Sequence, residues 1–184
     1  VYNLGNNASP NTDESGITES EVQSLFGSFQ FGYKGVLFLE VTGRNDWSST
    51  LPAANNSFFY PSVSMSAVIT DMFPSFNSRV LSFAKLRASW AQVGNDADPY
   101  LLDQVYLANG LWDGSIPMFA ENNQISNSTL KPERTTGIEV GADLRFFNGR
   151  LVLDATYYNQ TTEDQILGVD ISRASGYTNR VLNA

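Results

Sequence analysis

Two long stretches of alternating polarity flank the dipeptide Asn148-Gly149, and this arrangement restricts the fold more than any other part of the sequence. A type I′ turn needs positive φ at both central residues, so Asn-Gly between alternating runs is the strongest short-range signal for a hairpin. With this dipeptide as the loop, Phe146 lies opposite Leu151, and the apolar rows of both strands fall on one face. The sequence therefore predicts an antiparallel hairpin with one apolar and one polar face.

The two faces of this hairpin differ in composition. The apolar face holds Ile138, Val140, Ala142, Leu144, Phe146, Leu151, Leu153, Ala155 and Tyr157, whereas the opposite face is mostly polar. The first strand, residues 135–146, exceeds the roughly 5 to 6 residues of a typical soluble strand and is long enough for the about 9 to 11 residues of a tilted strand that crosses a bilayer. This length favours a membrane-spanning sheet.

The composition excludes several functional classes. The chain has 184 residues, no cysteine, no histidine and a formal charge of -8. Most zinc sites and the usual Ser-His-Asp or Cys-His systems cannot be built from this chain alone, so we expect no enzymatic activity and no cofactor. A pI near 4.4 argues against a nucleic-acid partner, which would require a clustered basic surface. No apolar run approaches the ~18 residues of a membrane helix, so any spanning would be done by strands.

Four further strands are predicted upstream of the hairpin, over residues 22–33, 36–42, 62–70 and 83–93. In the first pair, the apolar rows coincide only if the turn has an odd number of residues. We therefore predict a three-residue loop, Tyr33-Lys34-Gly35, in which Gly35 is left-handed.

The connections between the predicted strands alternate in length. In chain order they are a tight turn at 33–35, a long loop over 43–60, a moderate one over 72–82, a very long one over 95–133, and the tight Asn-Gly turn. Long and short ends therefore lie on opposite sides of the sheet, as in outer-membrane barrels with short periplasmic turns and longer extracellular loops. Periodicity alone would favour a soluble β-sandwich over a membrane barrel. Strand length and loop asymmetry instead favour the barrel.

We predict an all-β fold: an antiparallel transmembrane β-barrel segment of about six strands from a much larger barrel. Residues 1–184 would form part of one barrel domain. Its parts are a loop over 1–20, strands one to four over 21–95, a long extracellular loop over 96–132, a hairpin over 133–170 and a loop over 171–184. The chain opens at Val1 without an initiator methionine or a signal peptide, so we interpret it as a piece of a longer protein.

Six charged residues lie on the polar faces of the predicted strands and would line a barrel interior: Lys85, Arg87, Glu139, Asp143, Arg145 and Asp154. The predicted register places Asp143 directly opposite Asp154. Like charges so placed repel unless Arg145, a diagonal neighbour, or water relieves them. This pair favours a hydrated interior over a dry core.

The segment Arg44-Asn45-Asp46-Trp47-Ser48-Ser49 ends the second predicted strand. Strand ends that enter long loops need their freed backbone groups satisfied, so this cation, carboxylate and hydroxyl set would pair internally or hydrogen-bond loop backbone at the barrel rim. Contact with a substrate is the alternative for Arg44, Asp46 and Trp47.

The predicted loop over 95–133 is acidic and aromatic. Asp96, Asp98 and Asp103 supply oxygen ligands, but their spacing lacks the glycine and terminal glutamate of a calcium loop, so we expect a solvated acidic loop and no metal site. Tyr100 and Trp112 would either stack on a sugar or peptide substrate or bury themselves under the loop. The sequence leaves these two alternatives open.

Several motifs occur in a fixed order along the chain: GRNDWSSTLP at 43–52, FYPSVS at 59–64, LSFAKLRASW at 81–90, VGND at 93–96, LKPERT at 130–135 and YYN at 157–159. Together they resemble the barrel of SusC/RagA-type TonB-dependent outer-membrane transporters, the nutrient importers typical of Bacteroidota. The resemblance runs from about Val22 to the end of the chain.

This resemblance implies a barrel of about 22 strands with a plugged lumen. It implies a Gram-negative outer-membrane location in contact with lipid, import of oligosaccharides or peptides, and a SusD-like surface lipoprotein over the loops. Coupling to the TonB complex would use a plug domain and a TonB box that this sequence lacks. Two alternatives remain open: a passive porin or adhesin barrel without TonB coupling, and a secreted carbohydrate-binding β-sandwich.

Overall fold

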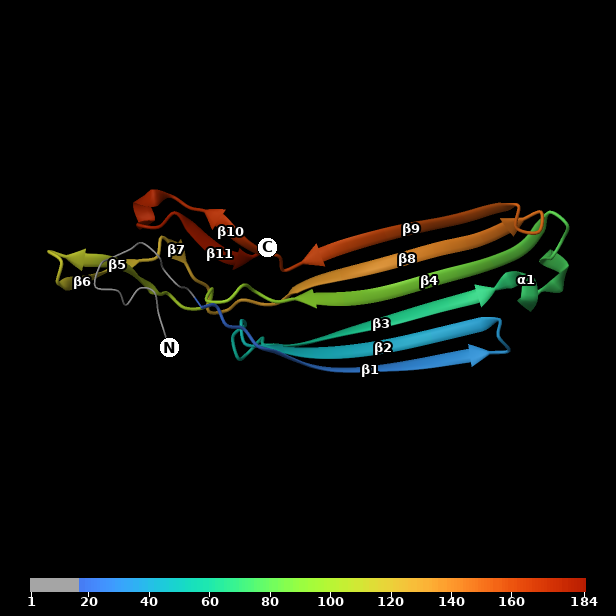
Figure 1. Ribbon diagram of the computed structural model, residues 1–184, viewed down its shortest axis with the longest axis horizontal. Helices are drawn as coiled ribbons and strands as arrows, with labels where there is room; N and C mark the ends of the chain where they lie inside the picture. The colour runs from blue at the N-terminus through green and yellow to red at the C-terminus, as the bar shows by residue number, and fades with distance from the viewer. Residues whose placement is uncertain (1–16) are drawn as a thin grey trace.

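The computed structural model describes residues 17–184 and shows one large antiparallel sheet as a single layer (Figure 1). The strand order is β1-β2-β3-β4-β8-β9, and the sheet is not closed. The strands are β1 (Val22–Tyr33), β2 (Leu37–Ser48), β3 (Ser57–Val68), β4 (Leu81–Asn95), β8 (Glu133–Phe146) and β9 (Leu151–Glu163). Each has 12 to 15 residues, so the predicted all-β fold of six long antiparallel strands is confirmed. Of the predicted loop over 1–20, residues 1–16 lie outside the described residues.

The β8–β9 hairpin has the predicted register. Phe146 pairs with Leu151, and Asn148 and Gly149 have φ values of 57° and 84°. Phe147 also has a positive φ of 52°, which the sequence did not predict. The amide of Gly149 donates to the carbonyl of Phe146 at 3.1 Å and so closes the turn.

The β1–β2 turn has the predicted odd length, but it lies one residue further along the chain. Tyr33 pairs with Leu37, so the loop is 34–36 instead of 33–35. Lys34 and Gly35 both have positive φ, and the amide of Val36 donates to the carbonyl of Tyr33 at 3.0 Å. Gly35 is left-handed as predicted. Val36 belongs to the loop in place of Tyr33, and the apolar rows of the two strands still lie on one face.

The predicted long loop over 43–60 is wrong. β2 runs to Ser48 and β3 begins at Ser57, so the connection is only 49–56. Gly43 and Pro61 are cross-strand partners inside the β2–β3 ladder, although glycine and proline are both poor strand formers. A side chain at Gly43 would meet the ring of Phe59 at 3.0 Å, so this glycine provides room for an aromatic residue on the neighbouring strand.

The β3–β4 connection contains two short helical turns, α1 (Ile69–Met72) and η2 (Pro74–Phe76), instead of a plain loop. The hydroxyl of Thr70, which was predicted to end the strand, accepts a hydrogen bond from the amide of Ala84 at 3.4 Å. We call the end of the sheet that carries this connection and the turns at 34–36 and 147–150 the short-turn rim. The opposite end is the long-loop rim (Figure 1).

The two segments predicted as loops, 96–132 and 171–184, contain secondary structure of their own, and the predicted hairpin over 133–170 ends at Glu163, so that residues 166–170 form a separate strand. β5 (Tyr106–Trp112) and β6 (Ile116–Glu121) form a hairpin, while β7 (Gln124–Ile125), β10 (Ile166–Asp170) and β11 (Asn179–Asn183) form a three-stranded sheet, with a short turn, η3 (Arg173–Ser175), between β10 and β11. β7 pairs in parallel with β11. The two strands are far apart in the sequence, so no local alternation of polar and apolar residues predicts that they pair.

A small buried cluster holds the long-loop rim together, and we call it the rim core: Leu51, Ala97, Leu130 and Val181. Leu130 is fully buried, with 0% exposure. Phe58, Leu101, Leu102 and Ile166 pack around the cluster. The rim core therefore joins four separate segments at the end of the sheet where the small strands gather.

The register carries one polarity pattern across all six strands. One row is apolar or aromatic: Phe31, Leu39, Met65, Ala88, Val140 and Tyr157. The adjacent row, which points to the other face, is polar: Gln30, Glu40, Ser64, Ser89, Glu139 and Tyr158. In the part of the chain that the structure describes, no second sheet covers the apolar face, and Met65 and Val140 are 50% and 51% exposed. This arrangement rules out the β-sandwich alternative for residues 17–184.

No helix among residues 17–184 is long and apolar enough to cross a membrane.

Candidate functional site

The polar face of the sheet contains a hollow of about 640 Å³ that faces the predicted barrel interior. Strands β1 to β4, β8 and β9 all contribute to it. Its lining includes Phe38, Glu40, Ser64, Lys85, Glu139 and Gly141. The hollow combines two phenylalanines, Phe31 and Phe38, with hydroxyl, carboxylate, ammonium and guanidinium groups, so it offers both hydrogen-bond donors and acceptors.

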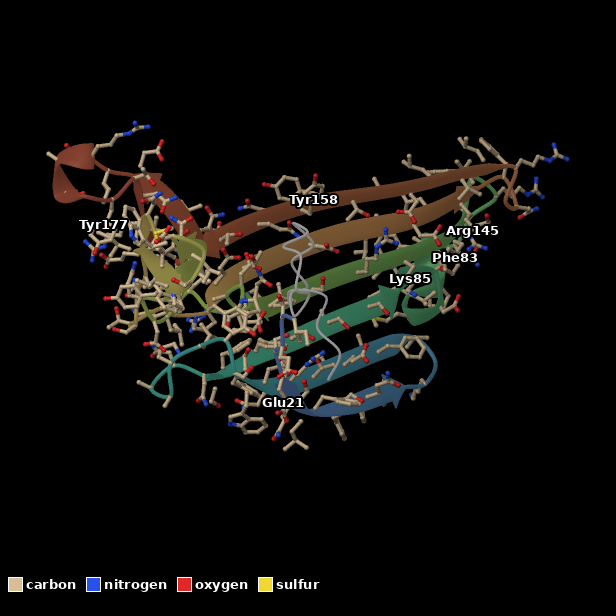
Figure 2. All side chains as sticks on the ribbon, turned by 60° about the vertical axis from the view of Figure 1, so that its left-hand side comes forward. Glu21, Phe83, Lys85, Arg145, Tyr158 and Tyr177 are labelled. Atoms are coloured by element: carbon tan, nitrogen blue, oxygen red, sulfur yellow. The ribbon has the colours of Figure 1, made fainter. Side chains whose placement is uncertain are left out.

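All six charges predicted for the interior project from the polar face, because each alternates with a residue of the apolar face along its strand. Lys85 lies opposite Asp143, which in turn lies opposite Asp154. The predicted Asp143–Asp154 pairing is therefore present. Figure 2 shows Phe83, Lys85 and Arg145 together near the short-turn rim, with Tyr177 at the opposite end.

Two ion pairs relieve the repulsion between these carboxylates. Arg145, the predicted neighbour, reaches Asp143 only at 3.4 Å between Nη2 and Oδ2. The stronger contact comes from Arg87, which was predicted to lie in the interior but without a partner. Its Nη2 lies 2.6 Å from Oδ1 of Asp154, and its Nη1 donates to Oδ2 at 3.2 Å. The glycine at 141, between these residues in the sheet, was the available signal for this contact.

Arg145 also contacts an aromatic ring. Its guanidinium carbon lies 4.7 Å from the ring centroid of Phe83, within the range of a cation–π interaction. The other oxygen of Asp143, Oδ1, is buried and has no hydrogen-bond partner among the described residues. Arg145 is therefore shared between a carboxylate and a ring.

The residues predicted at the barrel rim, Arg44, Asp46 and Trp47, lie on two different faces of the sheet. Arg44 and Asp46 lie on the polar face, where Nε of Arg44 contacts Oδ1 of Asp46 at 2.8 Å. Asp46 is 5% exposed and also accepts a hydrogen bond from the hydroxyl of Tyr60. Trp47 points to the apolar face, one position along the same strand, and is 41% exposed. Arg44 and Asp46 thus act together, and Trp47 is not part of their group.

Asp96 holds the start of the 49–56 connection. Its Oδ2 accepts hydrogen bonds from Ser48 at 2.6 Å and from Thr50 at 3.3 Å. Ser48 and Thr50 are buried, with 2% and 6% exposure. Glu21 donates its amide to the hydroxyl of Ser49 at 2.9 Å and so ties the base of β1 to the same connection.

Two predicted contact residues are exposed at the long-loop rim. Tyr100 has a φ of 67° and 60% exposure, and its hydroxyl accepts a hydrogen bond from the amide of Glu19. Trp112 ends β5 and is 65% exposed. Neither ring is buried under the loop. Among residues 17–184, no group of three or more Asp, Glu, His or Cys side chains gathers in a metal-binding arrangement.

The LKPE segment at 130–133 is held by side chains that the sequence patterns did not single out. Asn183 exchanges two hydrogen bonds with the backbone of Lys131, at 3.0 Å and 2.9 Å. Glu133 accepts from the amide of Ile166 at 2.8 Å and from Asn95 at 3.0 Å. This segment therefore anchors the start of β8 to the three-stranded sheet.

A tyrosine–carboxylate contact links the β5–β6 hairpin to the β10–β11 connection. The hydroxyl of Tyr177 donates to Oε1 of Glu121 at 2.7 Å. This hydrogen bond to a carboxylate raises the pKa of Tyr177 above its ordinary value, with burial and the charge of Glu121 adding to the effect.

A single-layer antiparallel sheet with one apolar and one polar face, short turns at one rim and long connections at the other, defines a segment of an outer-membrane-type β-barrel wall. The chain belongs to the family described as TonB dependent receptor-like, beta-barrel, whose model matches residues 1–184. The resemblance predicted from the motifs is confirmed.

Relatives within this family come from Formosa and Bacteroides. TonB-dependent receptor P26 of Formosa agariphila is 30% identical over 169 residues, which cover 89% of this chain and 17% of the relative. TonB-dependent receptor SusC of Bacteroides thetaiotaomicron is 27% identical over 160 residues, covering 84% of this chain and 16% of the relative. The chain spans about a sixth of the length of these curated relatives.

Solved structures share the fold. The RagAB peptide transporter matches with a TM-score of 0.78 and 24% identity, over 89% of this chain and 18% of that chain. The siderophore receptor PirA from Pseudomonas aeruginosa matches with a TM-score of 0.58 and 16% identity, over 90% of this chain and 29% of that chain. At these identities the likeness concerns the fold alone.

Proposed function

We propose that the full-length protein is a SusC-like TonB-dependent transporter that imports oligosaccharides or peptides across the outer membrane, and that this chain supplies part of its barrel wall and rim. The observation that carries the proposal is the unbroken polarity of the rows across six strands. An apolar row faces lipid, and a polar row with Glu40, Ser64 and Glu139 faces a water-filled interior.

The family membership supports TonB coupling over a passive porin or adhesin barrel. The segments that would couple to TonB lie outside this chain by family analogy, so no residue here is assigned to energy transfer. Relatives in the family are named receptors and a transporter, which supports a non-catalytic role. Relatives from Formosa and Bacteroides support an outer-membrane location in a Bacteroidota-like cell.

The candidate residues for substrate contact form two groups, according to the contacts that they make in the structure. Arg44, Asp46 and Asp96 satisfy neighbouring side chains of the wall and rim, and Trp47 faces the lipid side. Tyr100 and Trp112 keep exposed rings at the long-loop rim. We propose that these two rings meet the substrate, because exposed aromatic rings stack on sugar or peptide groups at little cost in conformational entropy.

A surface lipoprotein of the SusD type would sit over the long-loop rim, where the β5–β6 hairpin and the three-stranded sheet gather. The likeness to the SusC receptor and to the RagAB peptide transporter supports this part of the proposal. Affinity purification of the tagged full-length protein from outer membranes tests it. The expected result is co-purification of a lipoprotein encoded beside it, and purification of the barrel alone would contradict it.

Uptake measurements test the central proposal. Cells that express the full-length protein should accumulate labelled oligosaccharides or labelled peptides, and accumulation should stop when TonB is deleted or the proton-motive force is collapsed. Uptake that continues without TonB would identify a passive barrel instead. Trp112→Ala should weaken substrate binding at unchanged barrel abundance. Leu107→Ala, an exposed apolar residue in the same strand, is the matched control.

A further inference from the structure

Arg87 starts on β4 but forms its hydrogen bonds on β9, so its side chain crosses the whole width of β8. The register places Arg87 opposite Gly141, and Gly141 opposite Thr156. The guanidinium contacts both carboxylate oxygens of Asp154, and its Nη2 also donates to the hydroxyl of Thr156 at 2.6 Å. A bidentate arginine–carboxylate contact of this kind fixes both distance and orientation.

The side chain can make this crossing only by lying flat on the intervening strand. Neighbouring strands are about 4.7 to 4.9 Å apart, so Arg87 must span two such steps. At the crossing point the strand has no side chain, because residue 141 is glycine. A Cβ atom built there would lie 2.6 Å from Nε of Arg87 and 3.1 Å from its Cγ and Cζ.

Two further observations connect the glycine to the arginine. Gly141 is buried even though the polar face of the sheet is open, which is consistent with the arginine lying over it. The backbone at Gly141 is not in the left-handed region, so its conformation does not require glycine. The reason for glycine at this position is therefore the space above it.

We propose that Gly141 is a slot for Arg87, and that Arg87 is a positioning residue that clamps β4, β8 and β9 on the lumen side of the wall. The clamp balances the facing carboxylates Asp143 and Asp154. Arg87 lines the hollow, but the clamp holds its guanidinium against a carboxylate, so Arg87 is not a free charge offered to a transported solute. The lumen side of this proposal rests on the proposed function, whereas the clamp itself does not.

The clamp divides the six interior charges into two groups. Arg87 and Arg145 are committed to Asp154 and Asp143. Lys85 and Glu139 line the hollow and form no ion pair within the described part of the chain. Of the six, these two are therefore the charges that the wall presents without an ion-pair partner, and Glu40 of β2 lines the same hollow.

A substitution cycle in the full-length protein tests the slot. In general, alanine is favoured over glycine in a strand, so Gly→Ala should stabilise the sheet where space allows. Gly141→Ala should instead lower the midpoint of barrel unfolding, measured from heat-modifiable gel mobility. In an Arg87→Ala background the same change should leave the midpoint unchanged or raise it, because the clash is gone.

Gly137→Ala is the matched control. Gly137 lies on the same strand and face, but a Cβ there would meet only the side chain of Gln160 at an ordinary 3.5 Å. It should leave the midpoint unchanged or raise it in both backgrounds. An equal loss from Gly141→Ala with and without Arg87, or no loss in either, would overturn the slot.

The position of the guanidinium is a second readout that does not depend on stability. In an electron-microscopy map of the Gly141→Ala variant, the contact between Arg87 and Asp154 should be lost and the arginine should project away from the surface of β8. Density that still bridges Arg87 and Asp154 would overturn the proposal. Both readouts are independent of uptake, so failure of the clamp and failure of the transport function are separate outcomes.

Discussion

The side-chain amide of Asn183 pairs with both backbone groups of Lys131, much as a neighbouring strand would. The amide of Lys131 donates to Oδ1 at 3.0 Å, and Nδ2 donates to the carbonyl of Lys131 at 2.9 Å. Nδ2 also donates to the carbonyl of Asp164 at 2.8 Å. One side chain thus joins β11, the start of β8 and the end of β9.

Asn183→Asp should open this junction. The carboxylate keeps the acceptor but replaces the two donated hydrogen bonds with repulsion from carbonyl oxygens, at a cost of about 1 to 3 kcal/mol. Hydrogen–deuterium exchange should then accelerate over residues 124–133 and 164–184. Asn109→Asp, which adds the same charge on the exposed β5 strand, should leave both segments protected. Unchanged exchange in the Asn183 variant would contradict the role assigned to its amide.

Leu130→Ala should destabilise the rim core by about 2 to 5 kcal/mol, because Leu130 is fully buried and the vacated space is walled by other residues. The free energy of local opening, obtained from exchange rates over residues 124–133, measures the effect. Leu107→Ala removes the same atoms from a side chain that is 52% exposed and should cost much less. Similar losses at both leucines would mean that the rim core is loosely packed.

Met65→Arg and Ser64→Arg should differ widely although the two residues are adjacent. Met65 lies in the lipid-facing row, where arginine near the middle of the membrane costs roughly 2 to 4 kcal/mol. Ser64 lies in the polar row and lines the hollow. Reversible unfolding of the full-length barrel in lipid vesicles gives both values. Equal costs would mean that the two faces have been assigned incorrectly.

Leu153→Arg should behave like Met65→Arg, since Leu153 lies on the same apolar face of the sheet, in the β8–β9 hairpin. Thr156 is unsuitable as the interior control on this hairpin, because its hydroxyl accepts a hydrogen bond from Arg87. Gln160→Arg, on the same polar face of β9, avoids that contact. Insertion of the two variants into the outer membrane, followed by gel mobility, should show a loss for Leu153→Arg alone.

Tyr177 should titrate above the ordinary tyrosine pKa of about 10. Its folded-state pKa is raised, so the stabilising contact with Glu121 is fully present below the unfolded pKa and is lost as pH rises through the folded one. A difference titration of phenolate absorbance against Tyr177→Phe should show one group that ionises late. A group that ionises at or below the ordinary value would contradict the contact.

The long strands and their faces could be predicted because alternation is local. A register set by the Asn148-Gly149 dipeptide fixed the partners of Asp143 and Leu153, and the structure has those partners. The loop over 43–60 was predicted wrongly because Gly43 and Pro61 are poor strand formers taken singly, yet they lie opposite each other in the ladder. Tertiary pairing overrides such propensities.

The rim was harder to predict because its contacts join distant segments. Asn183 contacts Lys131, and β7 pairs with β11, without any periodic signal in either stretch. Arg87 was correctly placed on the polar face, but its partner lies two strands away, beyond what the spacing along one strand can indicate. Gly141 lies between Glu139 and Asp143 on that face, and a glycine in such a place is the signal that would have indicated the contact between Arg87 and Asp154.

The alternation along the six strands limits where related chains can change in length. Removing one residue from the middle of a strand, such as Glu40 of β2, would turn over the side chains beyond it and bring an apolar row to the interior, unless a bulge absorbs the change. The turns are less restricted, because the 34–36 loop has three residues and the 147–150 loop has four, and both leave the apolar rows on one face. Homologues should therefore gain or lose residues in the turns and in the 96–132 connection, and rarely inside the strands.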